Sequence, residues 1–176
     1  MSSEAVLGRL ETDRLLLRSS TVDDAAVFRE LWTERDPRVP AHRRISADGR
    51  PSVQDIAANL RSDLGKRGPR LLAVERKGVG DVIGYCGPVQ HGNGSPEEPE
   101  LAYELLRVAQ GFGYATEAAQ AVVGWARDAG YRRLWAGVWD WNAASRRVLD
   151  KLGFRETGRV EPRSEHGYSL LAVREL

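Results

Sequence analysis

Two glycines stand close together in the segment Gln110-Gly111-Phe112-Gly113-Tyr114-Ala115, where a strand pattern gives way to a helix pattern. Glycine lets the backbone turn sharply and exposes successive N–H groups, and the N-terminus of the following helix adds partial positive charge. Such a cradle suits a pyrophosphate better than a single carboxylate, so it points to a nucleotide-bearing cofactor. The alternative is a tight turn that serves only close helix packing.

The same segment lacks the signatures of two common nucleotide sites. No Gly-Lys-Ser/Thr follows the turn, as a phosphate-binding loop of the Walker type requires. The third glycine of a dinucleotide-binding fingerprint is replaced by Thr116 or Glu117. Nucleoside triphosphate hydrolysis and hydride transfer therefore both lose support.

A second candidate segment lies further along the chain and opens with Asn142-Ala143-Ala144-Ser145. Taken alone, Asn142 is most simply a helix N-cap and Ser145 a residue of the first turn. Gly153 followed by Phe154 is typical of a Schellman stop at the end of the same helix. Together with the glycine turn, this pattern is far more specific than either segment by itself.

Carboxylates on a third segment could act as acid or base. In a strand over residues 100–106, side-chain alternation puts Glu100 and Glu104 on one face. Either could accept a proton or hold a water molecule, and a solvated sheet face is the alternative interpretation. His166 is a third candidate because histidine titrates near neutral pH, although a loop histidine is more often simply solvated.

The hydrophobic patterns predict the elements that must position these residues. Helices are expected over residues 21–32, 52–64, 114–129 and 142–152, and strands over 15–17, 71–75, 82–89, 100–106, 133–138, 154–160 and 168–173. Residues 37–51 are expected to form a loop of the kind that shapes a substrate mouth. This order indicates a mixed α/β fold with a strand-helix-strand crossover in its second half.

Composition narrows the class of protein. The 176 residues, 41% hydrophobic and 29% charged, predict one folded domain rather than a two-domain enzyme. A net charge of +1 provides no large field for attracting nucleic acid or anionic lipid, so neither nucleic acid nor membrane is expected as a partner. The single cysteine and the lack of a secretory signal pattern at the start predict a cytoplasmic protein. No metal site is predicted.

The sequence resembles the GNAT acyltransferases, and within them the ribosomal-protein alanine N-acetyltransferase (RimJ/RimL-like) branch. The matching segments follow in order over nearly the whole chain: Thr12 to Arg18, Ile83-Gly84, Glu100 to Tyr103, Gln110 to Ala118, and Asn142 to Phe154. The resemblance implies a single GNAT domain over residues 1–176 with an α/β fold. Its mixed, mostly antiparallel sheet would be splayed, with about six to seven strands flanked by about four helices.

The resemblance also implies a cofactor, acetyl-CoA, and a role for each candidate. The residues expected to bind it are Leu105, Leu106, Gln110, Gly111, Phe112, Gly113, Tyr114, Ala115, Asn142 and Ser145. An amine would attack the thioester directly in a ternary complex, with a backbone N–H near Leu105 meeting the oxyanion. Glu100 or Glu104 would be the base. Ser145 would stabilise the leaving thiolate, because Leu149 stands where many relatives carry a tyrosine.

The chain departs from the family pattern in two places. Phe112 stands where relatives often carry a basic residue, and Arg107 or Arg146 are candidates to supply that charge instead. Near the C-terminus, Gly167-Tyr168-Ser169 replaces the acidic residue that many relatives show after a glycine turn, so their substrate pocket is not expected to transfer. The family also tends to carry a β-bulge in the strand over residues 100–106.

Three functions fit the resemblance. The first is acetyl transfer to a primary amine, either a protein N-terminal α-amine or a small-molecule amine. The alternatives are an acyl-CoA sensor of the same fold without turnover, and an enzyme that acetylates an antibiotic or metabolite amine. Trp135 is expected in the core, and Trp139 and Trp141 at the edge of the cleft or in a homodimer interface.

Overall fold

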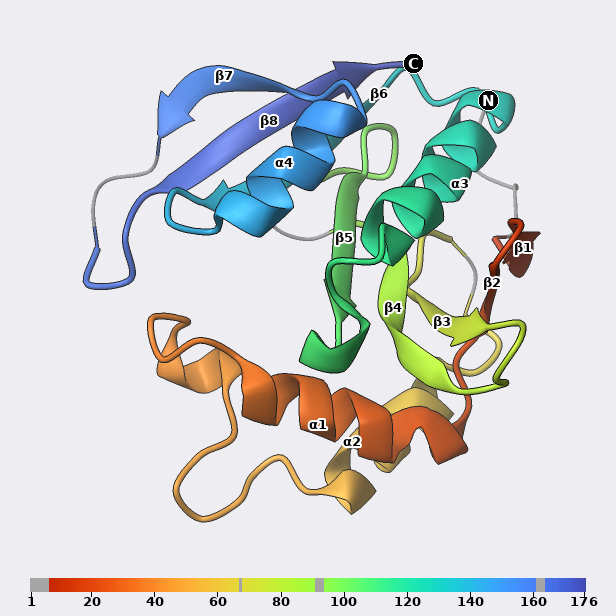
Figure 1. The fold of residues 1–176 in the computed structure, drawn as a ribbon, viewed down its shortest axis with the longest axis vertical. Helices are drawn as coiled ribbons and strands as arrows, with labels where there is room; N and C mark the ends of the chain where they lie inside the picture. The colour runs from red at the N-terminus through yellow and green to blue at the C-terminus, as the bar shows by residue number, and fades with distance from the viewer. Residues whose placement is uncertain (1–6, 67, 91–93, 161–163) are drawn as a thin grey trace.

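The chain forms one eight-stranded sheet with helices on both faces (Figure 1). The computed structural model describes residues 7–66, 68–90, 94–160 and 164–176. The strands, in the spatial order β1-β2-β3-β4-β5-β6-β8-β7, are β1 (Arg9–Glu11), β2 (Leu15–Ser19), β3 (Leu72–Arg76), β4 (Val82–Val89), β5 (Glu100–Leu105), β6 (Arg133–Trp139), β7 (Arg155–Val160) and β8 (Ser169–Glu175). The helices are α1 (Ala25–Glu34), α2 (Val53–Asp63), α3 (Tyr114–Asp128) and α4 (Ala143–Lys151). In the described part of the chain, none of these helices combines the length and apolar character needed to cross a bilayer.

The expected helices and strands are present in the expected order, and the sheet has one strand more than the six to seven predicted. The additional strand, β1, has one leucine between two charged residues, so its sequence carries no strand pattern. It forms because β2 offers an edge, with Leu10 opposite Leu17. The first helix also starts later than predicted, because Thr21 and Asp24 cap a short 3₁₀ turn ahead of α1.

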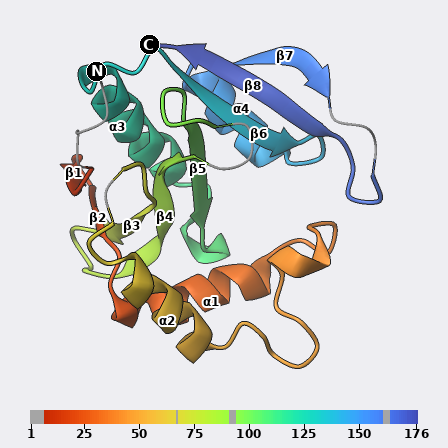
Figure 2. The ribbon, with the colours of Figure 1, turned by 180° about the vertical axis from the view of Figure 1, so that it is seen from behind.

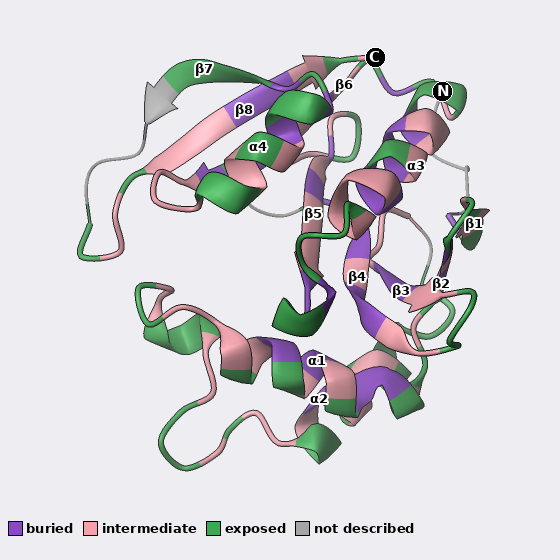
Figure 3. Cartoon of the chain, viewed as in Figure 1, coloured by how far each residue is buried: buried purple, intermediate pink, exposed green. Residues whose placement is uncertain are grey.

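The two helix pairs lie on opposite faces of the sheet, as the views from the front and from behind show (Figures 1 and 2). Residues of α3 and α4 pack on one face, where Leu72, Val74 and Leu101 belong to the main hydrophobic core. Residues of α1 and α2 pack with Ala73 and Leu106 in a second cluster. Buried segments gather in the middle of the sheet and along α1 and α3 (Figure 3). Each sheet face is thus closed by its own apolar layer.

The sheet is splayed between β5 and β6. These are its two parallel neighbours, and their ladder consists of the single pair Glu100 with Trp135. All other neighbouring strands are antiparallel. Beyond Glu100 the two strands separate, so the far half of β5 has β4 on one side and an open edge on the other.

The β-bulge expected in β5 is absent from its ladder with β4, and an irregularity lies between β3 and β4 instead. The register of β5 with β4 is continuous from Glu100 to Leu105, whereas the register of β3 with β4 shifts between Val74 and Glu75. Gly84 of β4 lies at this irregularity with φ of +156°. A Cβ atom there would lie 2.1 Å from the carbonyl oxygen of Glu104, so only glycine allows β4 to approach β5 this closely.

Candidate active site

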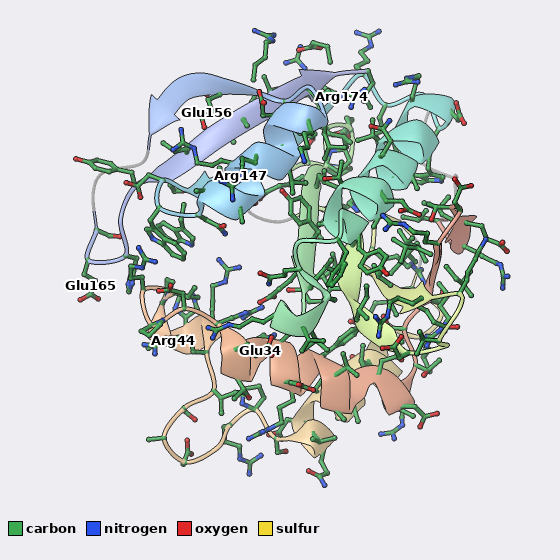
Figure 4. All side chains as sticks on the ribbon, viewed as in Figure 1. Glu34, Arg44, Arg147, Glu156, Glu165 and Arg174 are labelled. Atoms are coloured by element: carbon green, nitrogen blue, oxygen red, sulfur yellow. The ribbon has the colours of Figure 1, made fainter. Side chains whose placement is uncertain are left out.

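A cleft with a volume of about 480 Å³ lies at the separated ends of β5 and β6. Arg147 on α4 and Glu34 on α1, both labelled in Figure 4, belong to its two sides. Its walls come from the end of α1, the end of β5, the glycine turn and α4. The lining residues are Leu31, Glu34, Arg35, Asp36, Val39, Tyr103, Glu104, Leu105, Arg107, Ala109, Gln110, Gly111, Gly113, Tyr114, Ala115, Thr116, Trp141, Asn142, Ala144, Ser145, Arg147, Val148 and Lys151.

The cleft includes the residues expected to bind the cofactor, except Leu106 and Phe112. Leu106 is buried in the second cluster, against α1, and its N–H donates to the carbonyl of Ile83 at 2.9 Å. The side chain of Phe112 points outward and is 62% exposed. These two residues therefore support the loop and strand, while their neighbours form the cleft wall.

The glycine turn has the backbone conformation that the predicted cradle requires. Gly111 and Gly113 have φ of +84° and +82°, a backbone conformation that other residues rarely adopt. The first regular bond of α3 runs from the Glu117 N–H to the Gly113 carbonyl at 3.0 Å. The N–H groups of Tyr114 to Thr116 precede that bond and have no partner among the described residues, so they are available to an anion in the cleft.

An ion-pair network fixes this turn to the start of β2. The Glu117 carboxylate accepts from Thr12 Oγ1 at 2.6 Å, from the Arg14 N–H at 3.0 Å and from Arg14 Nε at 2.6 Å. Arg14 Nη1 also donates to the Phe112 carbonyl at 3.0 Å. Partial burial opposes ionisation of Glu117, but the bonds from Thr12 and Arg14 outweigh it and lower the pKa of Glu117. The two motifs lie about 100 residues apart, so no local pattern predicts the contact between them.

The open edge of β5 presents main-chain groups to the cleft. Gln110 Nε2 donates to the Leu105 carbonyl at 2.9 Å, so this carbonyl faces the splayed side rather than β4. The N–H and C=O of one strand residue point the same way, which places the Leu105 N–H on that edge as well. This is the main-chain group that the resemblance assigned to the oxyanion.

Glu104 lies at the α1 side of the cleft, where the Arg35 guanidinium and the Tyr85 hydroxyl hold its carboxylate. Arg35 donates from Nε to Oε1 at 2.8 Å and from Nη2 to Oε2 at 2.6 Å, and the Tyr85 hydroxyl donates to Oε2. Tyr85 stands directly opposite Glu104 in the ladder. Burial and the charge of Glu104 raise the pKa of Tyr85, which keeps its proton on the phenol. Neither Arg35 nor Tyr85 was predicted, because their contact with Glu104 is made across the fold.

The other acid–base candidates lie outside the cleft lining. Glu100 shares a strand face with Glu104 but stands about 13 Å away, at the paired end of β5. Its carboxylate accepts from the Gly137 N–H at 3.1 Å. His166 lies on the loop before β8, where its Nδ1 is 2.9 Å from the Arg38 carbonyl oxygen. Only Glu104 of the three faces the cleft.

Asn142 and Ser145 open α4 as predicted. The Asn142 side-chain oxygen accepts from the Ser145 N–H at 3.1 Å, which makes Asn142 the N-cap. Its side-chain NH₂ group is left to donate elsewhere, and both residues line the cleft. Gly153 ends the helix with φ of +77°, and the Phe154 N–H donates to the Leu149 carbonyl at 2.9 Å, which is the expected Schellman arrangement.

The profile of the acetyltransferase (GNAT) domain matches residues 14–155, a stretch that includes the glycine turn and α4. The chain belongs to the GNAT family of N-acetyltransferases. It is 30% identical over 182 residues to YoaA of Bacillus subtilis (strain 168), which is named an uncharacterized N-acetyltransferase. That similarity covers 94% of this chain and 98% of the relative.

Solved structures share the fold of this acetyltransferase. A GNAT-family acetyltransferase from Bacillus anthracis matches with a TM-score of 0.77 and 20% identity, covering 95% of this chain and 98% of the other. RimJ of Mycobacterium smegmatis in complex with CoA-disulfide matches with a TM-score of 0.70 and 22% identity, covering 92% of this chain and 81% of the other. At these identities the similarity shows a common architecture.

The cations of the acetyltransferase cleft differ from those expected. Arg147 and Lys151, one turn apart on α4, are exposed and line the same cleft as the glycine turn. Arg146 points the other way and pairs with Glu156 of β7 at 2.8 Å, so it does not replace the missing charge at Phe112. Arg107 does line the cleft, but its Nη2 donates to the Glu34 carbonyl at 2.5 Å.

Two of the tryptophans of the acetyltransferase, Trp139 and Trp141, pack against each other within the chain. Trp139 and Trp141 stack with ring centroids 6.4 Å apart and planes 4° apart, and Trp141 lines the cleft as predicted. Arg38 lies over the Trp141 ring at 4.0 Å. Trp135 is only partly buried, not in the core as predicted, because its indole N–H reaches Glu98 at 2.9 Å. A homodimer stays a prediction.

Replacing Arg147 tests whether the positive charge on α4 contributes to binding the phosphates of acetyl-CoA. Arg147→Gln is expected to raise the Kd for acetyl-CoA about three- to tenfold at low salt, and by less at high salt, because an exposed cation is screened. Arg146→Gln is the matched control and is expected to leave the Kd unchanged. Calorimetric titration measures both, and equal effects of the two substitutions would contradict the assignment.

Proposed function

We propose that the protein is an acetyl-CoA-dependent N-acetyltransferase that transfers the acetyl group to a primary amine, on a protein N-terminus or a small molecule. The observation that carries the proposal is that one cleft contains two different sets of residues, one suited to the cofactor and one suited to the amine. The glycine turn, Asn142 and Ser145 lie on the α3–α4 side, and Glu104 lies on the α1 side. The open edge of β5 at Leu105 lies between them.

The α3–α4 side fits acetyl-CoA. The N–H groups at the start of α3 that lack a partner in the described part of the chain suit its diphosphate. Arg147 and Lys151 add positive charge to the lining of the same cleft. The NH₂ group of Asn142 and the open edge at Leu105 offer hydrogen bonds to an amide-containing arm such as pantetheine. When bound, acetyl-CoA supplies a thioester carbonyl that an amine can attack and a thiolate that can leave.

The α1 side fits the amine. Arg35 and Tyr85 fix the Glu104 carboxylate in one orientation, so it can hold the attacking amine or a water molecule that takes the proton. An α-amine ionises near pH 7.7 to 8.0, so a useful fraction is neutral at pH 7 and a weak base suffices. The Leu105 N–H on the open edge can meet the developing oxyanion, and Ser145 the leaving sulfur. This arrangement supports direct attack of the amine in a ternary complex.

Coenzyme A release tests the function. The protein, mixed with acetyl-CoA and a panel of peptides with free N-termini, polyamines and aminoglycosides, is expected to release free thiol with at least one class of amine. Ser145→Ala is expected to lower kcat about tenfold or more, with the protein still folded at the assay temperature, because one hydrogen bond to the leaving group is lost. Tight acetyl-CoA binding with no release across the panel would favour the acyl-CoA sensor instead. The preferred amine separates peptide from small-molecule acetylation.

Replacing Glu104 and Glu100 separately tests which carboxylate acts on the attacking amine. Glu104→Gln is expected to lower kcat about 10- to 100-fold, because a positioned general base or water-holding group contributes on that scale. Glu100→Gln removes the same charge from the same strand face at the paired end of β5, and its effect on kcat is expected to be at least tenfold smaller. Steady-state kinetics and thermal denaturation of both variants separate lost catalysis from lost stability. A larger loss in Glu100→Gln would contradict the assignment.

A further inference from the structure

Tyr103 reaches across the cleft wall from β5 to α4. Its hydroxyl lies 2.9 Å from Ser145 Oγ and 3.1 Å from the Ser145 carbonyl oxygen. It stands on the face of β5 opposite Glu104 and packs against the main core, and both Tyr103 and Ser145 line the cleft. No other partner of Ser145 Oγ is found among the described residues.

The distances around Tyr103 fit two arrangements of the hydroxyl protons. A phenol has one proton to donate, and a serine hydroxyl also has one. Inside α4 the Ser145 carbonyl already has the Leu149 N–H as its regular helical partner. A carbonyl oxygen accepts up to two hydrogen bonds, so the Tyr103 proton can go to the Ser145 carbonyl or to Ser145 Oγ. When Tyr103 donates to Oγ, the Ser145 proton points away from Tyr103 and is free to point into the cleft.

We propose that Tyr103 is a positioning residue that directs the Ser145 hydroxyl proton toward the sulfur of the leaving thiolate. The assignment rests on the proposed function, and it extends that function to a residue on the opposite side of the cleft wall from α4. Serine alone can rotate its hydroxyl among several orientations. The hydrogen bond from Tyr103 selects the hydroxyl orientation that stabilises the thiolate. The Ser145 hydroxyl is therefore already oriented before the reaction begins.

Both hydroxyls keep their protons throughout. The C–N bond forms, the C–S bond breaks, and the sulfur takes the bonding electron pair. The amine gives up its proton on the Glu104 side. Burial raises the pKa of Tyr103 to about 12, well above the value near 8.5 that is ordinary for a thiol. Tyr103 and Ser145 therefore stabilise the thiolate by hydrogen bonding, and the sulfur takes its proton from water.

A cycle of four proteins tests the proposal: the unchanged chain, Tyr103→Phe, Ser145→Ala and the double variant. Tyr103→Phe keeps the ring and removes only the hydroxyl. It is expected to lower kcat about five- to twentyfold, with the KM for acetyl-CoA changed less than twofold, as for one hydrogen bond to a charged group. In the Ser145→Ala background, Tyr103→Phe is expected to have no further effect on kcat. Tyr131→Phe changes another buried core tyrosine outside the cleft lining and is the matched control.

Binding of coenzyme A alone gives a readout that does not depend on turnover. The ultraviolet absorbance of the thiolate, followed against pH in the binary complex, reports the pKa of the bound thiol. That pKa is expected to rise in Tyr103→Phe and in Ser145→Ala, and to rise no further in the double variant. All four proteins have the same charged groups in the cleft lining. These groups are Arg147 and Lys151 on α4 and, on the other side, Glu34, Arg35, Asp36, Glu104 and Arg107.

The possible outcomes distinguish a failure of the role of Tyr103 from a failure of the proposed acetyltransferase function. If the two substitutions lower kcat independently, so that their effects multiply, the role of Tyr103 is overturned. An unchanged thiol pKa in Tyr103→Phe would overturn it as well. Neither result would affect the proposed function. A fall in melting temperature that accounts for the lost kcat would overturn the role of Tyr103 too, since the residue would then be structural. Failure of the unchanged chain to bind coenzyme A would overturn the proposed function, and the role of Tyr103 with it.

Discussion

The separation of β5 from β6 is the constraint on which the site depends. The two parallel strands pair only at Glu100 and Trp135, so the second half of β5 keeps an unpaired edge inside the molecule. Buried main-chain groups without partners are costly, and Gln110 satisfies only the Leu105 carbonyl from within the chain. The remaining edge is available to an extended ligand with amide groups. The cleft, its two sets of residues and the placing of α4 beside β5 all follow from this one opening in the sheet.

Long-range polar contacts hold the walls of the opening in place. Arg35, at the end of α1, pairs with Glu104, and its side chain is only 8% exposed. Replacing either partner would leave the other charge partly buried, which is why such pairs fix geometry more than they add stability. On the far face, the pair of Tyr103 and Ser145 ties β5 to α4. The glycine turn is fixed separately, through Arg14 and Glu117. Each functional segment therefore has its own anchor in a different part of the chain.

Local signals in the sequence predicted most of the fold, and contacts between distant segments explain what they missed. The N-cap at Asn142 and the helix stop at Gly153 depend on neighbouring residues, and both were predicted. The link between Arg35 and Glu104 spans 69 positions, and no local pattern reports it. The sequence analysis named Arg146 as a candidate cation, whereas Arg147 lines the cleft. Neighbouring helix residues point about 100° apart, and the sequence did not fix that phase. β1 has no pattern of its own and exists through its pairing with β2.

Amide resonances of the glycine turn offer the most direct test of the account. In a ¹H–¹⁵N correlation spectrum of the uniformly labelled protein, addition of coenzyme A is expected to move the backbone resonances of Gly111, Gly113 and Tyr114 to Thr116 strongly, because these N–H groups would bind the diphosphate. Binding of coenzyme A that left these resonances in place, while shifting those of another surface, would contradict the account.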